Sequence, residues 1–430
     1  MEEDQLLKSL LESNPNDTEE SQPYDFSKNP NWFKRTFSYM ETGSLRGSIL
    51  TLSANTIGAG LLSLPFAVKM AGLVPGVLML VLGGWVFSFF YKVLIKAHDH
   101  SGVYSYIGLV QSFLGETWRR GVELSFVFGG VGVLCAFQAL SGHYLLQLFF
   151  KSGILSSDYE WWRVVIMSFA SLFVLSPLCI PKQLTSLRYT SSICIFAIFY
   201  ITVILIIQLP DYTREVTPEV SFFRVNSSMV HAFTLCVFAS DGTLAIPFIY
   251  QELQRRCYTR MCKVIDRSVV MNLSFYILLA VVGYLSLGEN TPSLITDRKY
   301  LWEGTDWFML VAEFLIAFAL LFSIPLRIAP LRTGLDQMVY GVHSAKQGWV
   351  FYTATYVGLY LSTGIAILVP EAIKYFIFIG GILIVPIAFI IPSLFYLQLE
   401  KSYLKRILVM SMSVVLGATG IYSAVTTFFK

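Results

Sequence analysis

Long apolar runs alternate with short polar segments from about residue 46 to the C-terminus. A helix that crosses a bilayer needs roughly 20 mainly apolar residues. The mixed stretch 99–120 does not meet this criterion and predicts a helix at the membrane surface. The pattern as a whole predicts an all-α integral membrane protein. Its eleven expected transmembrane helices lie at about 46–68, 73–97, 121–150, 162–181, 187–209, 228–250, 264–288, 306–328, 349–369, 373–398 and 405–428.

The segment before the first apolar run is polar and acidic, and it lacks the basic start and apolar core of a signal peptide. We expect a disordered tail over 1–43 and a transmembrane domain over 44–430. The tail contains Glu2-Glu3-Asp4-Gln5-Leu6-Leu7, which matches the acidic dileucine sorting pattern E-x-x-x-L-L. A chance match in an acidic tail is the alternative interpretation. The expected location is an endolysosomal or vacuolar membrane, or else the plasma membrane.

Lysine and arginine are distributed unevenly between the two ends of the predicted spans. The side that would hold the tail carries seventeen of them, and the opposite side carries eight plus Lys430 at the C-terminus. Because cytoplasmic loops carry the excess positive charge in most membrane proteins, we expect the N-terminus to be cytoplasmic. The sequon Asn226-Ser227-Ser228 then lies in a non-cytoplasmic loop, where Asn226 is a candidate glycosylation site.

The composition excludes several other classes of protein. Of the 430 residues, 55% are hydrophobic and only 14% are charged, whereas soluble domains are about 25% charged. No metalloprotease, P-loop, kinase or nucleophile-elbow motif occurs, and the six cysteines form no C-x-x-C pair. We therefore predict a protein that is not an enzyme and has no cofactor and no nucleic-acid partner. We expect a monomer in the lipid bilayer.

A short motif occurs twice along the chain. The first predicted span contains Gly60-Leu61-Leu62-Ser63-Leu64-Pro65-Phe66, and the sixth contains Gly242-Thr243-Leu244-Ala245-Ile246-Pro247-Phe248. Both segments have the pattern G-x-L-x-(L/I)-P-F. Because five spans separate their starts, the two copies cross the membrane in opposite directions. This predicts an inverted repeat of five plus five spans, over about 46–209 and 228–398, with an extra helix at 405–428.

The glycine and proline of this motif predict interrupted helices. Glycine weakens a helix, and proline removes one amide hydrogen bond. Irregular backbone at membrane depth is tolerated only where it lines a cavity or is buried in protein. Interrupted spans at matching positions of two halves are therefore the best indication of a transporter's binding site. The alternative is that these glycines serve only close helix packing.

Three ordered motifs resemble the amino acid/auxin permease family. The first is Ile57–Pro65 (IGAGLLSLP). The second includes Tyr250–Leu253, Arg260–Ser268 and Gly283–Gly288. The third is Phe322-Ser323-Ile324-Pro325, followed by Pro330 and Arg332. The resemblance covers most of 44–430 and implies a LeuT-type fold of eleven helices. In that fold, spans 1, 2, 6 and 7 would move against a scaffold of spans 3, 4, 8 and 9.

An amino acid presents a carboxylate and an ammonium group, and each needs partners. Free amides at the break of span 1 can bind the carboxylate, helped by the positive end of the outer half-helix. Free carbonyls at the break of span 6 can bind the ammonium group. The resemblance implies the same assignment. The expected substrate-binding residues are Ile57, Gly58, Ala59, Gly60, Phe238, Ala239, Ser240, Asp241 and Gly242.

For the coupling ion, the residues leave sodium and a proton as the two candidates. A sodium site like those of sodium-coupled relatives needs oxygens from the span 1 break and a hydroxyl in span 8, which Ser323 supplies. These relatives carry an asparagine where this chain has Ala54. Asn55 is one residue later, which rotates its side chain by about 100°. Asp241 is an intramembrane carboxylate that can hold the substrate or carry a proton, or simply cap a half-helix. We expect proton coupling or uncoupled exchange, with sodium as the alternative.

Together these observations predict a secondary active transporter that moves amino acids by alternating access. One alternative is a membrane amino acid sensor that signals through its tail. A second is a subunit of a membrane complex that has lost transport. For Glu123, Glu313 and His143, we expect structural roles rather than proton transfer.

Overall fold

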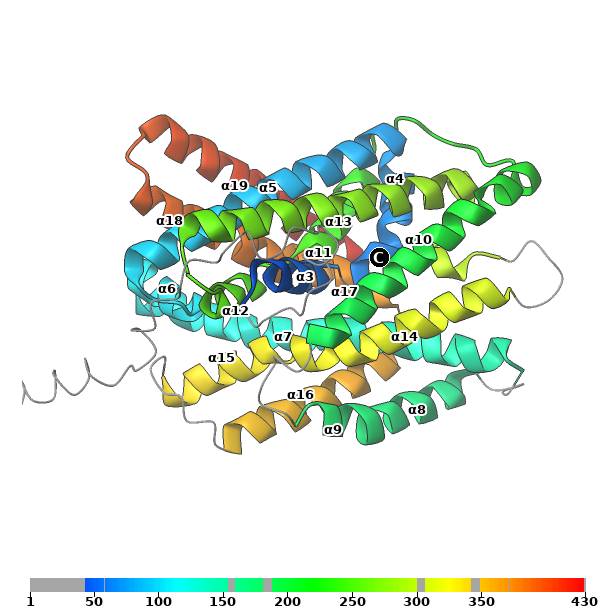
Figure 1. Ribbon diagram of the computed structural model, residues 1–430, viewed down its shortest axis with the longest axis horizontal. Helices are drawn as coiled ribbons and strands as arrows, with labels where there is room; N and C mark the ends of the chain where they lie inside the picture. The colour runs from blue at the N-terminus through cyan, green and yellow to red at the C-terminus, as the bar shows by residue number, and fades with distance from the viewer. Residues whose placement is uncertain are drawn as a thin grey trace, which may run out of the picture. The chain divides into compact units, whose positions relative to one another are not determined.

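The computed structural model describes residues 43–57, 59–153, 159–180, 188–299, 306–341, 349–369 and 371–428. The acidic dileucine motif and Gly58 lie outside these ranges. All regular structure in the described residues is helical, and none of it is strand (Figure 1). The predicted all-α class is confirmed for this part of the chain.

Nine helices of the described residues are long and apolar enough to cross a membrane. They correspond to nine of the predicted runs. Six of them are single helices: α5 (Leu73–Ser101), α7 (Glu116–Lys151), α10 (Arg188–Val216), α13 (Tyr258–Leu287), α14 (Trp307–Arg327) and α16 (Trp349–Leu368). Two contain π-helical turns, between α8 (Tyr159–Phe169) and α9 (Ser176–Leu178) and between α17 (Ala372–Ile379) and α18 (Ile391–Leu399). The ninth, α19 (Tyr403–Phe428), is also a single helix.

The first predicted span is a bent pair of helices. α3 (Leu45–Thr56) ends at Ile57, whose backbone is extended. A 3-10 turn over Ala59–Ser63 then leads into α4 (Leu64–Ala71), and the two halves are bent by 54°. Pro65 lies in the first turn of α4, where its missing amide hydrogen costs no intrahelical bond. Counted as one span, this pair is the tenth.

The sixth predicted span is also divided. α11 (Ser228–Ser240) ends at Asp241, whose backbone is extended, and α12 (Ala245–Glu252) begins four residues later. Pro247 lies in the first turn of α12, as Pro65 does in α4. Both copies of the repeated motif therefore start a new half-helix after an interruption.

The helices pack in two groups. α3, α4 and α5 pack around α13, with α11 against α4 and α5, whereas α14, α15 (Ala329–Tyr340) and α16 pack around α7 (Figure 1). α10 contacts α3, α13 and α14, so it touches both groups. Large apolar side chains point outward from many helices, among them Trp85, Phe128 and Leu404. Such an apolar surface requires a lipid environment, so the protein is an integral membrane protein.

The stretch 99–120, predicted as a surface helix, is more closely packed than expected. It holds α6 (Tyr106–Leu114), in which Ile107, Leu109 and Val110 are buried. The Tyr106 hydroxyl donates to the carbonyl of Ile387 at 2.7 Å. The apolar face of this short helix therefore packs on protein, against α7 and α18, and is not available to bind lipid.

Candidate functional site

The two helix breaks meet inside the protein. A Cβ atom added to Gly242 would lie 2.8 Å from Thr56 Oγ1, so the α11–α12 connection approaches the end of α3 closely. The buried hydroxyl of Tyr276, on α13, lies 2.7 Å from the carbonyl oxygen of Ala239 and 3.1 Å from that of Thr56. One tyrosine therefore bridges the two interrupted spans.

A second tyrosine satisfies the backbone of the α11–α12 break. The Tyr91 hydroxyl, from α5, accepts a 2.7 Å hydrogen bond from the Gly242 amide and donates to the Ser240 carbonyl at 3.2 Å. A free backbone group in this environment costs roughly 1–3 kcal/mol if it is left without a partner. Tyr91 removes that cost for both groups.

Asp241 turns its side chain back onto its own loop. Its Oδ1 accepts hydrogen bonds from the Thr243 amide at 3.1 Å and from the Thr243 hydroxyl at 2.7 Å. Bonds to a residue two positions ahead form the Asx turn typical of short acidic side chains. The arrangement stabilises the turn before α12, whose own N-cap is Leu244, and keeps the carboxylate at the break.

The carbonyl end of α3 is occupied by an arginine. Arg327, the last residue of α14, donates from Nη2 to the Asn55 carbonyl at 2.6 Å. Its guanidinium carbon lies 4.8 Å from the ring centre of Phe137 on α7. A helix C-terminus carries a partial negative charge, and an aromatic face attracts cations. Both features favour a positive group at this position.

The predicted substrate residues divide into two sets. The structure brings Ala239, Ser240 and Gly242 next to the end of α3, as the preceding contacts describe. Ile57, at the end of α3, and Gly60, in the 3-10 turn that contacts α11, are also buried. The backbone of Phe238 belongs to the last turn of α11, and that of Ala59 begins the 3-10 turn.

The predicted ion-coupling side chains are directed to their own helices. Asn55 Nδ2 donates to the Thr51 carbonyl at 2.9 Å, and Ser323 Oγ donates to the Ala319 carbonyl at 2.7 Å. Asn226 lies in the loop before α11, where its side-chain oxygen accepts from the Ser228 hydroxyl.

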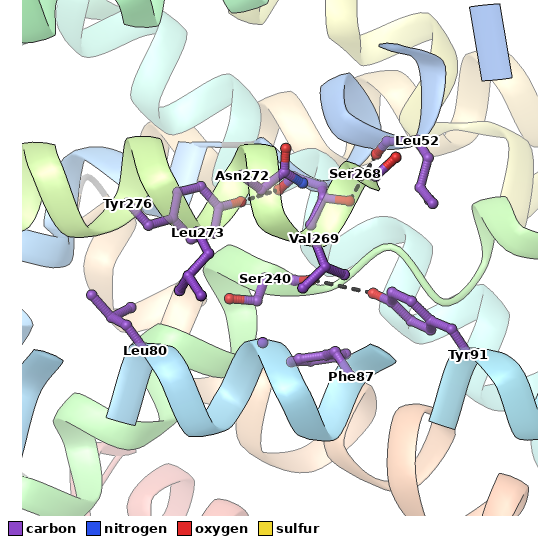
Figure 2. A pocket seen from close by; sticks show the side chains of 12 residues that line it. Leu52, Leu80, Phe87, Tyr91, Ser240, Ser268, Val269, Asn272, Leu273 and Tyr276 are labelled. Atoms are coloured by element: carbon purple, nitrogen blue, oxygen red, sulfur yellow. Dashed lines mark hydrogen bonds between the residues drawn. The ribbon is translucent and has the colours of Figure 1, made fainter. Parts of the chain in front are cut away.

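A pocket of about 370 Å³, including its open mouth, lies beside the breaks and between α3, α5, α11 and α13 (Figure 2). Ser268, Asn272 and Tyr276 face it from one side of α13, and Leu80 and Phe87 face it from α5. Asn272 is 4% exposed, and its Oδ1 has no hydrogen-bond partner in the described part of the chain. The pocket is apolar on the α5 side and carries polar groups on the α13 side, where an ordered water has hydrogen-bond partners.

A second polar cluster lies at the end of the bundle that carries Arg224, hereafter the Arg224 end. Asp297 accepts hydrogen bonds from His143 at 2.8 Å and from Gln147 at 2.9 Å. Lys151 donates to Gln147 and forms an ion pair with Glu313, whose side chain is fully buried. These bonds join α7, α14 and the turn at 295–297, so they give His143 and Glu313 structural partners.

Glu123 also has a structural partner. Its buried carboxylate pairs with Arg119 one turn earlier on α7. The pair satisfies a charge that would be costly to bury alone.

The sequence did not single out Tyr91, Tyr276 or Arg327. In the sequence, Tyr91 ends the aromatic stretch 87–91 of the second predicted span, which predicts lipid contact or packing. Arg327 lies at the end of the eighth predicted span and is one of the seventeen positive charges counted on the side of the tail. Tyr276 had a usable signal, because Ser268, Asn272 and Tyr276 recur every four residues and form a polar stripe on one helix face.

Comparisons with known proteins agree with this architecture. A family model described as transmembrane amino acid transporter protein matches residues 41–428. The AAT1 protein of Toxoplasma gondii is 27% identical over 307 residues, which cover 70% of this chain and 41% of that protein. The sodium-coupled neutral amino acid symporter 2 of Danio rerio is 23% identical over 382 residues, 82% of this chain and 75% of the relative.

The vacuolar amino acid transporter 7 of Saccharomyces cerevisiae is 23% identical over 313 residues, 69% of this chain and 60% of the relative. The chain thus spans less than half of the Toxoplasma protein and three quarters of the Danio protein. The family match covers nearly the whole chain and includes both interrupted spans. The protein therefore belongs to the transmembrane amino acid transporter family, whose members are membrane carriers and not enzymes.

Proposed function

We propose that this protein is a secondary active transporter that moves amino acids across a membrane by alternating access. The observation that carries the proposal is the meeting of two interrupted helices, bridged by Tyr276 between the Thr56 and Ala239 carbonyls. Interrupted helices expose backbone donors and acceptors at membrane depth, where a zwitterion can use them. Family membership supports the same function.

We propose a LeuT-type fold with eleven spans for this transporter. Nine apolar helices, the bent α3–α4 pair and the divided α11–α12 segment lie in the same order as the eleven predicted runs. The repeated motif opens α4 and α12, which start the second half of the first and sixth spans. In this proposal the groups around α13 and α7 are the mobile bundle and the scaffold.

The substrate would lie against both breaks. Amides at Ala59 and Gly60 begin a helix and have no acceptor within it, so they can bind a carboxylate. The carbonyls of Ala239 and Ser240 each accept one tyrosine hydrogen bond and keep a second lone pair for an ammonium group. Asp241 contributes a negative charge beside these carbonyls, which suits the ammonium group.

We further propose that the N-terminus is cytoplasmic and that the Arg224 end faces the opposite side. The distribution of lysine and arginine supports this orientation. The yeast relative is named vacuolar, whereas the name of the Danio relative specifies no membrane. The comparisons therefore do not decide which membrane holds this protein. The acidic dileucine motif favours an endolysosomal or vacuolar membrane over the plasma membrane.

Uptake of radiolabelled amino acids by the purified protein in liposomes tests the function. A panel of amino acids is offered while sodium and pH gradients are varied independently. We expect uptake of at least one amino acid above that of empty liposomes. Substrate binding without flux would instead favour a sensor, and neither binding nor flux would favour a subunit that has lost transport.

A glycine variant tests the site. In Gly242→Ala, the added Cβ is crowded by Thr56 Oγ1, 2.8 Å away, and by the Tyr91 hydroxyl, 3.3 Å away. We expect a large loss of uptake. The matched control is Gly83→Ala on α5, where a Cβ meets no atom within 4 Å. Equal uptake by both variants would show that the break at Gly242 is not part of the transport site.

A further inference from the structure

Arg327 is a charged residue at the helix breaks for which amino acid binding supplies no role. It is the last residue of α14, and its guanidinium donates to the Asn55 carbonyl at 2.6 Å. Asn55 is the penultimate residue of α3, so its carbonyl cannot be satisfied within that helix. The contact therefore joins the two helix groups at the interruption itself.

The carbonyl end of α3 would attract a cation from any source. The aligned peptide dipoles of a helix give its C-terminus about half a negative charge. Neighbouring carbonyls are already used, because Leu52 accepts from the Thr56 hydroxyl at 2.7 Å and Thr56 accepts from Tyr276. The Asn55 carbonyl has as its partner the positive guanidinium of Arg327.

The surroundings of Arg327 hold the charge in place. The Phe137 ring of α7 lies 4.8 Å from the guanidinium carbon, in the range of a cation–π contact. The carboxylate of Asp241 is near enough to attract the guanidinium electrostatically. An ammonium group or a metal ion entering the same position would meet a positive charge that is already there.

We propose that Arg327 is the resident cation of this site, fixed by the carbonyl end of α3, and that amino acid transport consequently does not require sodium. The inference rests on the proposed transport function and deepens it. Arg327 acts as a positioning residue, because it neutralises the end of α3 and ties this mobile half-helix to α14. A free cation such as sodium would neutralise the end of α3 only while it is bound, whereas the charge of Arg327 is part of the chain.

The first test compares uptake in sodium chloride with uptake in the chloride of a large organic cation such as N-methyl-glucamine, at equal pH on both sides. We expect the wild-type protein to transport equally well in both media. A loss of about tenfold or more without sodium would overturn the proposal while leaving the transport function intact. Absence of uptake in both media would count against the transport function instead.

The second test removes the charge. Arg327→Ala should lower uptake by about tenfold or more, and Arg327→Lys should retain a larger part of it, because lysine keeps the charge but not the planar donor geometry. Arg120→Gln is the matched control, since the Arg120 side chain is 74% exposed on α7. Wild-type uptake by Arg327→Ala would overturn the proposal.

Chemical rescue separates a missing cation from a general packing defect. Free guanidinium ion at millimolar concentration should restore part of the uptake of Arg327→Ala and leave that of Arg120→Gln unchanged. The same ion should raise the thermal unfolding midpoint of purified Arg327→Ala but not that of the wild type, a readout that needs no flux. If neither uptake nor midpoint responds and Arg327→Lys is as impaired as Arg327→Ala, the resident-cation role is wrong.

Discussion

Two tyrosine hydroxyls satisfy much of the backbone that the helix breaks leave free. Tyr276 donates to carbonyls of both interrupted spans, and Tyr91 binds the amide and carbonyl on either side of Asp241. Inside a membrane protein no bulk water replaces these partners. The breaks therefore depend on side chains from α5 and α13 rather than on the interrupted helices themselves.

Removing the bridging hydroxyl should destabilise the protein. We expect Tyr276→Phe to lower the free energy of unfolding by about 1–3 kcal/mol, because two buried carbonyls lose a donor. The measurement is the thermal unfolding midpoint in detergent, together with amino acid uptake. Tyr403→Phe is the control, since Tyr403 is 74% exposed. Equal midpoints for the two variants would show that the bridge contributes nothing to stability.

Asp241 allows a test that separates its structural role in the turn before α12 from proton transfer. Asparagine preserves an oxygen that can accept from the Thr243 amide and hydroxyl, so Asp241→Asn should fold normally. If the carboxylate carries the coupling proton, uptake by the variant should no longer respond to a pH gradient. Uptake is measured at several outer pH values with a constant inner pH. A response that matches the wild type would assign Asp241 to the turn alone.

Side-chain roles at the breaks were only partly predictable from the sequence. The repeated motif located the interruptions, because glycine and proline act on the backbone directly. Whether Tyr91 faces lipid or the break depends on the rotation of α5 about its axis, which tertiary contacts set. Arg327 was assigned to the cytoplasmic charges, since apolar runs do not locate a helix end to within one turn.

At the scale of helices, the prediction depended on length and hydropathy. A run of about 20 apolar residues is decisive in a membrane, so the nine continuous spans followed directly. The π-helical turns at Ala170–Leu175 and Gly380–Ile384 could not be foreseen in the same way. Such turns change the rotation of a helix without changing its hydropathy.

One helix crossing depends on two glycines. A Cβ added to Gly381 would lie 2.2 Å from the carbonyl oxygen of Gly420 on α19. Since that atom is backbone, no side-chain rotation relieves the clash. We expect Gly381→Ala to lower the thermal unfolding midpoint clearly, as small residues permit close helix packing in membranes.

Gly364→Ala on α16 is the matched control for this crossing, because its Cβ would meet no atom within 4 Å. Both variants add one methyl group to a membrane helix. If they unfold at the same temperature, α19 can shift away from Gly381 at little cost, and the close contact with Gly420 does not limit stability.

Across the whole molecule, the Arg224 end is closed by polar contacts between elements that are distant in sequence. Arg224 pairs with Glu289 at 2.7 Å, and Lys69 donates to the Thr291 carbonyl at 3.0 Å. Asp297 accepts from His143 and Gln147 of α7. The segment that follows α13 is therefore bonded both to its own helix group and to the α7 group.

If the proposed alternating access operates, these contacts must be broken and remade, so each of them should be weak. We expect Asp297→Asn to loosen the segment 288–299 from α7, since a neutral acceptor binds a histidine ring less strongly than a carboxylate does. Amide hydrogen exchange in 288–299 should accelerate by about tenfold, while exchange in the centre of α7 stays constant.

The Lys374–Glu371 pair provides the control, because it is exposed and joins residues three positions apart. Lys374→Ala should leave exchange in 288–299 unchanged, as surface ion pairs contribute little. If Asp297→Asn also leaves it unchanged, the cluster does not hold this end closed. Closure would then depend on the packing of α4 against α11 and α13, which apolar contacts provide and a single charge cannot release.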